Sequence, residues 1–569
     1  MIRKSLEMCR RHFVAAAAFS ALVNLLNIAP TLYMLQVYDR VIPTRGVRTL
    51  IFLTLVLLFS LATLALLDRA RTRLLARVGV RLDVLLAPHV LDAALSKPNL
   101  PGARAALRDF DTMRGTLTGP SILAVFDVPW VPIYILVCFL VHPWIGFVAV
   151  AGCIIVPLVA WINARATRDR LDRAQAAASL SYSNQDAVLS SADSVRALGM
   201  RRALVSRQMR QRTAMLAAQT EASLATGGYV AITKFVRLAL QSVALGLGAL
   251  LAVDNLISGG AVFASSFLIA RALQPIEQLI ATWRGIVHAR QSFRSLDALL
   301  ASAPATAQRT QLPAPRGDLA LEGVTLLNDT RDGTVLQGVS LNVRAGEVIA
   351  IVGPSGAGKS TLVRLIAGAL VADRGAVRID GADVRDWEPE SLARHIGYLP
   401  QDFALFAGTI AENIARFETE LGGNRAEIDE RIVAAAEKVG ADPLIRRLTG
   451  GFDHKLTLGG RGLSAGQAQR IALARAVYGD PAVLILDEPN AHLDSEGDAA
   501  LIAAVSTLKR EGRTILIVSH KLGILPVVDK LLVLRDGRVH LFGPRDEVLS
   551  KIAAPPSGRI VSAPVVKSS

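Results

Sequence analysis

Residues 348–361 read VIAIVGPSGAGKST, and this stretch predicts more of the architecture than any other part of the chain. The apolar run Val348–Val352 is typical of a buried strand, and the glycine-rich segment after it fits GxxxxGK[ST]. In such a loop, backbone N–H groups at the start of a helix converge on phosphates. Other β-rich runs, EVIAIVG, AVLILDE and TILIVSH, lie between helical patterns. We therefore predict an α/β P-loop domain with largely parallel strands that binds a nucleotide.

The residues of this loop have distinct expected tasks. Lys359 is expected to reach the β and γ phosphates, and Ser360 is expected to supply an oxygen ligand for Mg²⁺. The strand, the loop and the helix occur in the required order, which argues against a chance glycine-rich turn. The predicted nucleotide-binding residues of the loop are Gly353, Pro354, Ser355, Gly356, Ala357, Gly358, Lys359, Ser360 and Thr361.

A second apolar strand, VLIL at residues 483–486, is followed by two carboxylates, Asp487 and Glu488. Strand ends often carry a solvated acid, so this pattern alone decides nothing. With a P-loop upstream, we expect Asp487 to hold Mg²⁺ and Glu488 to act as the general base that polarises the attacking water.

Composition separates the two halves of the 569-residue chain. The mean hydropathy of +0.39, with 51% hydrophobic and 20% charged residues, is too apolar for an ordinary soluble enzyme. Residues 1–316 hold 34 Lys and Arg against 16 Asp and Glu, whereas residues 317–569 hold 29 against 32. The positive excess lies next to apolar segments, as in cytoplasmic loops beside a bilayer, so we expect a membrane protein without a nucleic-acid partner.

Six apolar stretches in the first half are long enough to cross a hydrocarbon layer of about 30 Å. They form three pairs joined by short turns, YDRVIPTRGVR in the first pair, His142 and Pro143 in the second, and Asp254 and Asn255 in the third. The predicted spans are residues 13–37, 49–67, 122–141, 144–162, 229–253 and 256–272.

Positive charge predicts which ends of these spans face the cytoplasm. The N-terminal segment and the long polar segments 68–120 and 163–228 together hold 23 Lys and Arg, and the predicted outside turns hold three. By the positive-inside rule, the long segments are cytoplasmic, and so is the nucleotide-binding domain. We predict a six-span helical transmembrane domain at residues 1–301, a linker at 302–316, an ATP-binding domain at 317–552 and a flexible tail at 553–569.

The segment Leu463-Ser-Ala-Gly-Gln467, just before the second strand, resembles the signature loop of ATP-binding cassette transporters. This resemblance covers nearly the whole chain and implies an ABC exporter that binds ATP and Mg²⁺ and couples ATP hydrolysis to transport. It also implies a homodimer, in which each ATP lies between the P-loop of one copy and the signature loop of the other. The further residues that it implies are Gln401 of the Q-loop as a catalytic residue and Mg²⁺ ligand, His520 as the switch histidine, Asp494 of the D-loop, and Ser464, Ala465, Gly466 and Gln467 of the signature.

Three positions depart from the family pattern. Asn328 stands where an aromatic residue usually stacks on adenine, and Ala465 replaces a signature glycine. Gly460 stands where exporters usually carry a glutamate, which puts one contact between domains in doubt. We expect a working ATPase, because the lysine, the two carboxylates and the histidine are all present.

Three stretches, YMLQVYDRVIPT, FDVPWVPIYILVCFLVHPW and ALQPIEQLI, resemble the PrtD-like permease/ATPases of type I secretion, which are related to HlyB-type exporters. The resemblance implies a multi-pass protein of the bacterial inner membrane. It would export an unfolded protein with a C-terminal signal, such as an RTX-like protease, a lipase or an S-layer protein, through a periplasmic adaptor and an outer-membrane channel. No peptidase domain stands before the first span in this sequence, so we expect the PrtD-like branch.

Other interpretations remain open at this point. An ABC exporter of a lipid or small molecule would share every ATPase motif and the six spans, and a soluble cassette ATPase of DNA maintenance would share the P-loop but needs no spans. Asp127 is either a functional ionisable group at membrane depth or an interfacial residue. Pro275 either kinks the end of the sixth helix or serves ordinary packing.

Overall fold

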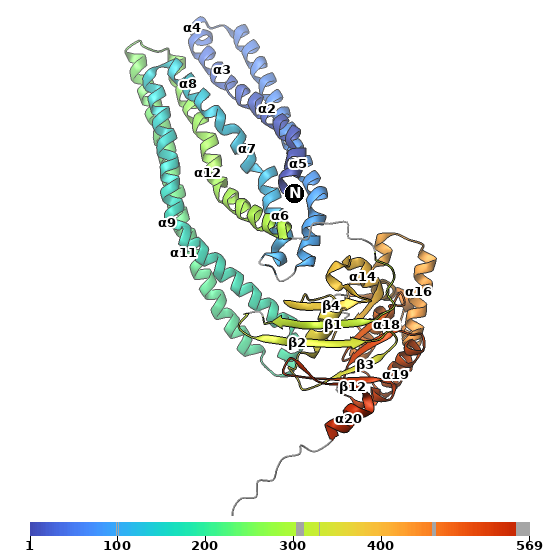
Figure 1. Cartoon of the computed structure of the whole chain (residues 1–569). Coiled ribbons are helices and arrows are strands. Elements are labelled where there is room, and N and C mark those ends of the chain that lie inside the picture. The colour runs from blue at the N-terminus through green and yellow to red at the C-terminus, as the bar shows by residue number, and fades with distance from the viewer. Residues whose placement is uncertain are drawn as a thin grey trace, which may run out of the picture. The chain divides into compact units, whose positions relative to one another are not determined.

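The computed structural model describes residues 1–97, 100, 102–302, 312–328, 331–457, 462–519 and 521–553. The chain divides into two compact units, Met1–Ala305 and Thr306–Ser569 (Figure 1). Most of the predicted linker 302–316 and of the predicted tail 553–569 lies outside the described residues.

The first unit is helical throughout its described residues, and six of its helical segments are long and apolar enough to cross a membrane. This confirms the predicted fold class of six spans. The segments are Arg10–Thr44, Val47–Ser96, Ala106–Val141, Pro143–Leu189, Ala231–Val253 and Gly259–Ser302. Their helices are α1 (Ile2–Met8), α2 (Arg10–Leu26), α3 (Ala29–Gln36), the π-helix η1 (Val37–Val41), α4 (Ile42–Thr44), α5 (Val47–Ser96), η2 (Ala103–Ala105), α6 (Ala106–Thr118), α7 (Pro120–Asp127), η3 (Val128–Trp130), α8 (Val131–Val141), α9 (Pro143–Ser190), α10 (Ala192–Ala197), α11 (Arg201–Val253) and α12 (Gly259–Ser302).

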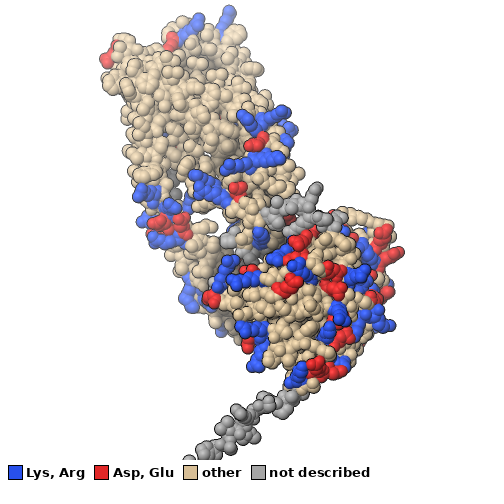
Figure 2. Space-filling model, viewed as in Figure 1, with Lys and Arg blue, Asp and Glu red and all other residues tan. Residues whose placement is uncertain are grey.

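Several of these helices extend far beyond a bilayer. Helix α5 has 50 residues and α11 has 53, which at 1.5 Å per residue gives about 75 to 80 Å, more than twice the hydrocarbon thickness. After Arg48 in its first turn, α5 carries exposed apolar side chains such as Phe52 and Phe59, and exposed arginines return at Arg69. Figure 2 shows the same change on the surface, where a region almost free of charge gives way to clustered Lys and Arg along the helical unit.

The first and third spans are interrupted where proline removes a backbone donor or glycine breaks the helix. In the first span, Pro30 stands at the start of α3, and the π-helix η1 follows at Val37–Val41. In the third, the break at Gly119 and Pro120 separates α6 from α7, Pro129 lies within the short 3₁₀ turn η3, and Pro132 lies in the first turn of α8.

The predicted start of the sixth span was wrong. The helix begins at Gly259 rather than at Leu256, because the Leu256 N–H donates to Leu251 O at 2.8 Å and Asn255 adopts a left-handed conformation (φ 57°), which ends α11. Pro275 does not mark the end of the sixth helix, since α12 continues to Ser302. Pro275 is buried within the helix, as expected of a packing residue.

The second unit is α/β and contains a six-stranded sheet and a four-stranded antiparallel sheet. The six-stranded sheet has the order β12-β11-β3-β10-β9-β6, and all its neighbours are parallel except the edge strand β12. The four-stranded sheet has the order β2-β1-β4-β5. The strands are β1 (Leu319–Leu327), β2 (Thr334–Val343), β3 (Val348–Val352), β4 (Arg374–Ile379), β5 (Ala382–Asp383), β6 (Ile396–Leu399), β9 (Val483–Asp487), β10 (Thr514–Val518), β11 (Lys530–Arg535) and β12 (Arg538–Pro544), with β7 (Gly408–Thr409) and β8 (Lys455–Leu456) in a separate pair.

Helices cover both faces of the six-stranded sheet. Helix α13 (Lys359–Ile366) buries its apolar residues in one core with strands of both larger sheets. The other face forms a second core with α15, α16, α18 and α19. The helices of this unit after α13 are α14 (Pro389–His395), α15 (Ile410–Ile414), η5 (Glu418–Leu421), α16 (Arg425–Lys438), α17 (Asp442–Arg447), η6 (Gly451–Asp453), α18 (Ala465–Val477), α19 (Ser495–Arg510), η8 (Leu522–Val527) and α20 (Arg545–Ala553), with η4 (Val384–Asp386) after β5.

Candidate functional site

Four neighbouring parallel strands place the predicted catalytic segments at one edge of the sheet. The P-loop follows β3, Ser519 follows β10, Asp487 ends β9, and Gln401 comes two residues after β6. In the register, Val518 pairs with both Ile351 and Asp487, and Leu399 pairs with Leu486. Because the carboxyl ends of parallel strands meet at the same edge, residues far apart in sequence converge there.

The P-loop can adopt its backbone conformation only because three of its residues are glycines. Gly353, Gly356 and Gly358 all have positive φ, at 152°, 80° and 95°. A Cβ on Gly353 would collide with the Leu534 carbonyl oxygen, and one on Gly358 would lie 2.8 Å from Leu336 Cδ2. Gly358 is also the N-cap residue of α13. Because it has no side chain, it offers no acceptor to the N–H groups at the start of this helix. These backbone N–H groups are suited to bind phosphate oxygens.

Lys359 lies inside the loop rather than in solvent. Its Nζ donates to Gly353 O and Pro354 O, both at 2.9 Å, and only 6% of the residue is exposed. A buried ammonium held by two carbonyls places a positive charge at the centre of the phosphate-binding loop. Ser360 and Thr361 follow in the first turn of α13, and Ser355 is exposed at the tip of the loop.

Asp487 has the features expected of a magnesium ligand. It is 2% exposed, and its Oδ1 has no hydrogen-bond partner among the described residues. Burial raises the pKa of this carboxyl, while a hydrogen bond from the Ser360 hydroxyl and the charge of Lys359 act in the opposite direction. A buried carboxylate oxygen without a donor, beside a hydroxyl at the start of α13, fits a hard cation that prefers oxygen ligands.

Glu488 adopts a left-handed backbone conformation (φ 52°), which is strained for a residue other than glycine. Its N–H donates to Val518 O at 2.9 Å and so fixes the end of β9 against the end of β10. The left-handed conformation changes the direction of the chain at Glu488. The two carboxylates therefore follow one another in sequence but take different backbone conformations, as their different predicted tasks require.

The signature segment forms the first turn of α18. Ser464 is the N-cap, its Oγ accepts from the Gln467 N–H at 3.2 Å, and Gln467 Oε1 accepts from the Ser464 N–H at 2.9 Å. Gly466 must lack a side chain, since a Cβ would lie 2.9 Å from His492 O. Ala465 and Ser464 are exposed, so the methyl group that replaces the usual glycine hydrogen points out of the core.

Sequence reasoning missed Gln469, which lies one turn further along α18 and is only 2% exposed. Its Nε2 donates to Glu488 O at 3.2 Å and Pro489 O at 2.7 Å, and its Oε1 accepts from the His492 N–H at 3.0 Å. This single side chain joins the signature helix to the loop after β9. A polar residue in a helical pattern gives no signal of such burial.

The remaining predicted residues occupy several places. Asp494 caps α19, accepting from the Gly497 N–H at 2.8 Å and from Arg470 Nη2 at 2.9 Å. Gln401 is exposed beside the end of β9. Asn328 directly follows β1, and its side chain forms hydrogen bonds with Asp332 and the Gly333 N–H. His520 and Gly460 lie outside the described residues.

Comparison with known proteins identifies the architecture. Residues 13–275 match the family described as the ABC transporter transmembrane region, and residues 336–491 match the family described as ABC transporter. The chain is 40% identical to the type I secretion system ATP-binding protein PrsD of Rhizobium meliloti, over 97% of this chain and 94% of that protein. The chain belongs to the ABC transporters of type I secretion. It is therefore an exporter that couples ATP hydrolysis to transport.

Other relatives support the same assignment. The transporter is 30% identical to the cyclolysin secretion/processing ATP-binding protein CyaB of Bordetella pertussis, over 95% of this chain and 76% of that protein. Its fold matches a bacterial Atm1-family ABC exporter with ATP bound, with a TM-score of 0.80, 22% identity, and coverage of 96% and 99% of the two chains. The six candidate spans exclude the soluble cassette ATPase considered above.

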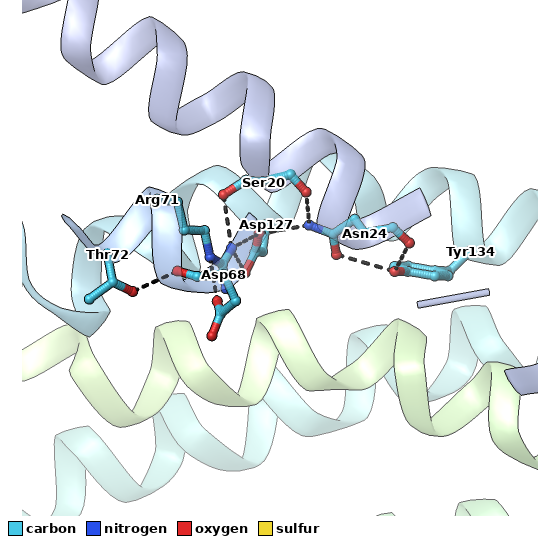
Figure 3. Close-up of polar contacts among 7 residues, drawn as sticks. All are labelled: Ser20, Asn24, Asp68, Arg71, Thr72, Asp127 and Tyr134. Atoms are coloured by element: carbon cyan, nitrogen blue, oxygen red, sulfur yellow. Dashed lines mark hydrogen bonds and ion pairs between the residues drawn. The ribbon is translucent and has the colours of Figure 1, made fainter. Parts of the chain in front are cut away.

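The transporter also buries a polar cluster among its first three spans (Figure 3). Asp127 is 8% exposed and Arg71 is 9% exposed, and Arg71 Nη1 lies 3.2 Å from Asp127 Oδ1. Arg71 Nη1 also donates to Ser20 Oγ at 2.9 Å, and Asn24 Nδ2 donates to Asp127 Oδ1 at 2.7 Å. The Tyr134 hydroxyl donates to Asn24 O at 2.7 Å. Asp127 is thus buried between helices, and the cluster ties α2, α5 and the interrupted third span together.

Proposed function

We propose that this transporter is the inner-membrane component of a type I secretion system and exports an unfolded protein that carries a C-terminal signal. The observation that carries this proposal is the similarity to PrsD along 97% of the chain, which includes both the spans and the ATPase unit. Relatives that align over most of their length are named for the secretion of cyclolysin and the translocation of leukotoxin. These names favour a protein cargo over a lipid or small molecule.

In the proposed ATPase site, this chain's residues bind the nucleotide and prepare the attack of water. The P-loop N–H groups and Lys359 hold the phosphates, and Glu488 accepts a proton from the attacking water. Ser360 and Asp487 would hold Mg²⁺, with Gln401 next to them. When bound, the ion would neutralise negative charge on the phosphates. His520 completes the proposed catalytic set as the residue after Ser519 at the end of the β10 segment.

The proposed working form is a homodimer. Ser464 and Ala465 are exposed at the start of α18, where they are available to a second copy. The site would form when the signature residues Ser464 to Gln467 and Asp494 of one copy cover the ATP held by the P-loop of the other. We also propose that a periplasmic adaptor and an outer-membrane channel continue the path, and that membrane lipids surround the spans.

The domain limits given above, at residues 301, 316 and 552, are retained in this proposal. They place helix α12 almost entirely in the transmembrane domain and β1 at the start of the ATP-binding domain. The ATP-binding domain is proposed to lie in the cytoplasm, because the positively charged ends of the long helices mark that side.

The experiment that tests the proposal compares the culture medium of the source organism carrying the wild-type gene with that of a strain carrying Glu488→Gln. The substitution removes the general base but keeps the size of the side chain, so it should abolish ATP turnover without preventing assembly. Quantitative proteomics should show the loss of one or a few proteins that share a C-terminal region. Equal amounts of both transporters in isolated membranes are the control.

An unchanged medium, with Glu488→Gln present in the membrane and inactive as an ATPase, would contradict protein export and favour a lipid or small-molecule cargo. Asp487→Asn tests the magnesium assignment separately. Because the amide keeps the shape but loses the charge, the concentration of Mg²⁺ that gives half-maximal ATPase activity should rise at least tenfold. An unchanged magnesium requirement would remove Asp487 from the ligand set.

A further inference from the structure

A second carboxylate, Asp39, joins the end of the first span to the start of the sixth. Asp39 Oδ1 accepts from the Gly260 N–H at 2.7 Å, and Asp39 Oδ2 accepts from the Ser258 hydroxyl. Ser258 Oγ in turn accepts from the Ala261 N–H at 3.2 Å. The carboxylate and the hydroxyl thus satisfy two of the N–H groups that the first turn of α12 leaves without helical partners.

An aromatic contact lies beside these hydrogen bonds. The rings of Tyr38 and Phe263 are stacked, with centroids 4.4 Å apart and planes 21° apart. Tyr38 precedes Asp39 on the π-helix η1, and Phe263 lies one turn beyond Gly260 on α12. Polar and apolar contacts therefore hold the same two elements together. We call the set Tyr38, Asp39, Ser258, Gly260 and Phe263 the outer latch.

Two features of the backbone are adapted to this contact. A Cβ on Gly260 would lie 2.7 Å from Asp39 Oδ1 and 2.8 Å from its Cγ, so only glycine lets the carboxylate approach. Asp39 belongs to a five-residue π-helix, a winding that occurs mostly as a short insertion in α-helices and often at functional sites. The negative charge of Asp39 is also favourable at the N-terminus of α12.

Connectivity places the outer latch at the end of the helical unit opposite to its N-terminus and to the end of α12. Asp39 follows the first span, and Ser258 follows the fifth, so each lies after an odd number of crossings from the N-terminus. The end of α12 that leads to the ATPase unit follows the sixth crossing. The outer latch therefore lies at the end from which cargo would leave.

The outer latch is reversible in a way that the buried cluster around Asp127 is not. Tyr38, Asp39 and Phe263 are exposed, so water can replace each hydrogen bond when the contact opens. An exposed carboxylate at a helix N-terminus makes only a weak contribution, which salt screens further. A contact of this strength can be broken and restored in every transport cycle.

We propose that the outer latch is a gate, which joins the first and sixth spans when the outer end of the cargo path is closed and must open for cargo to leave. The proposal rests on the proposed export of a protein cargo. It makes Asp39 and Gly260 positioning residues for cargo release, separate from the ATPase machinery.

The contact can be tested with the double variant Asp39→Cys/Gly260→Cys. Asp39 Cγ lies 2.8 Å from the position of a Cβ on residue 260, close to the distance of about 3 Å between a sulfur and the opposite Cβ in a disulfide. A thiol at position 39 is therefore placed to reach a thiol at position 260. Oxidation should lock the latch, and a membrane-permeant phosphine should release it.

Export is measured as cargo in the medium of cells that carry each variant, with equal membrane levels confirmed. The oxidised double variant should export at least tenfold less cargo than the same cells after reduction, while its basal ATPase activity in detergent changes less than twofold. The two single-cysteine variants, treated in the same way, control for the native cysteines, which are unpaired, and should not respond to oxidant.

Undiminished export by the fully oxidised variant would overturn the gate, because the two spans could then move as one. Loss of basal ATPase together with export would also overturn it, since the cross-link would then disable the whole transporter. If the wild-type strain exports no protein at all, the proposed function fails instead, and the two failures are distinguishable.

A second measurement does not depend on the double variant. In Phe263→Cys, a membrane-impermeant maleimide should react at least threefold faster in cells that are exporting cargo than in cells that also carry Glu488→Gln. Equal labelling rates in the two strains would contradict opening of the latch during transport.

Discussion

The carboxylates Asp127 and Asp39 both fasten the first span to a neighbour, but in different surroundings. Asp127 is buried with Arg71, Ser20 and Asn24, and its partners come from two other spans. Asp39 is exposed and accepts from the start of α12. The same functional group thus makes a contact that is costly to open in one place and a contact that opens easily in the other.

The difference follows from what replaces each contact when it breaks. Water can solvate Asp39, so opening the outer latch costs little. Opening the cluster around Asp127 would leave a charge without a partner in a protein interior within the membrane domain, which is expensive. We expect the first three spans to move as one body during transport, with relative motion at the outer latch.

The largest expected effect is that of removing one partner of the buried pair. Asp127→Ala should lower the free energy of unfolding by about 3 kcal/mol, because the buried Arg71 would lose its buried carboxylate partner and keep only Asp68, which is half exposed. Denaturant titration of purified protein in detergent measures this loss. The double variant Arg71→Met/Asp127→Leu removes both charges and should lose much less; an equal loss in both variants would contradict the pairing.

A smaller effect is expected at Asn24. Asn24→Ala removes the donor to Asp127 and an acceptor of the Tyr134 hydroxyl, although the Asn24 carbonyl oxygen, which accepts at 2.7 Å, remains. The loss should be about 1 to 3 kcal/mol by the same titration. Tyr134→Phe, which removes only the hydroxyl, is the matched variant and should cost less than Asn24→Ala. The reverse order would mean that the hydroxyl, rather than the amide, holds the cluster.

The smallest effect on stability is expected at the outer latch. Asp39→Asn keeps an acceptor for the Gly260 N–H but removes the charge. The free energy of unfolding should therefore fall by about 0.3 to 1 kcal/mol. Screening by salt should reduce even this difference, whereas it should leave the effect of Asp127→Ala nearly unchanged. Titrations at low and high salt compare the two variants directly, and equal salt dependence would remove the distinction between them.

Gly260→Ala distinguishes steric from electrostatic effects at the same place. The added methyl group would meet the Asp39 carboxylate at 2.7 to 2.8 Å, so the outer latch should be held open. We expect labelling at Phe263→Cys to become fast and independent of ATP turnover in this background. Slow labelling would show that the latch absorbs the methyl group without opening.

The sequence was sufficient for features carried by local patterns. Apolar runs predicted six spans, and GPSGAGKST predicted a phosphate-binding loop, because each depends on residues that are close in sequence. The pair Arg71–Asp127 joins residues 56 apart, and the contact from Gly260 to Asp39 joins residues 221 apart. No periodicity reveals such partners, and the start of α12 was misplaced because Asn255 and Leu256 end α11 through a backbone turn.

The burial of Gln469 has a kinetic consequence for a dimeric ATPase. Its helix begins with the signature residues proposed to cover the partner's ATP, and its amide holds the backbone of Glu488, the general base proposed for the chain's own ATP. One short helix thus links the two nucleotides. ATP hydrolysis in the assembled dimer should therefore be cooperative, with a Hill coefficient above one, and dimers that combine one wild-type with one Glu488→Gln copy should retain less than half of the wild-type rate.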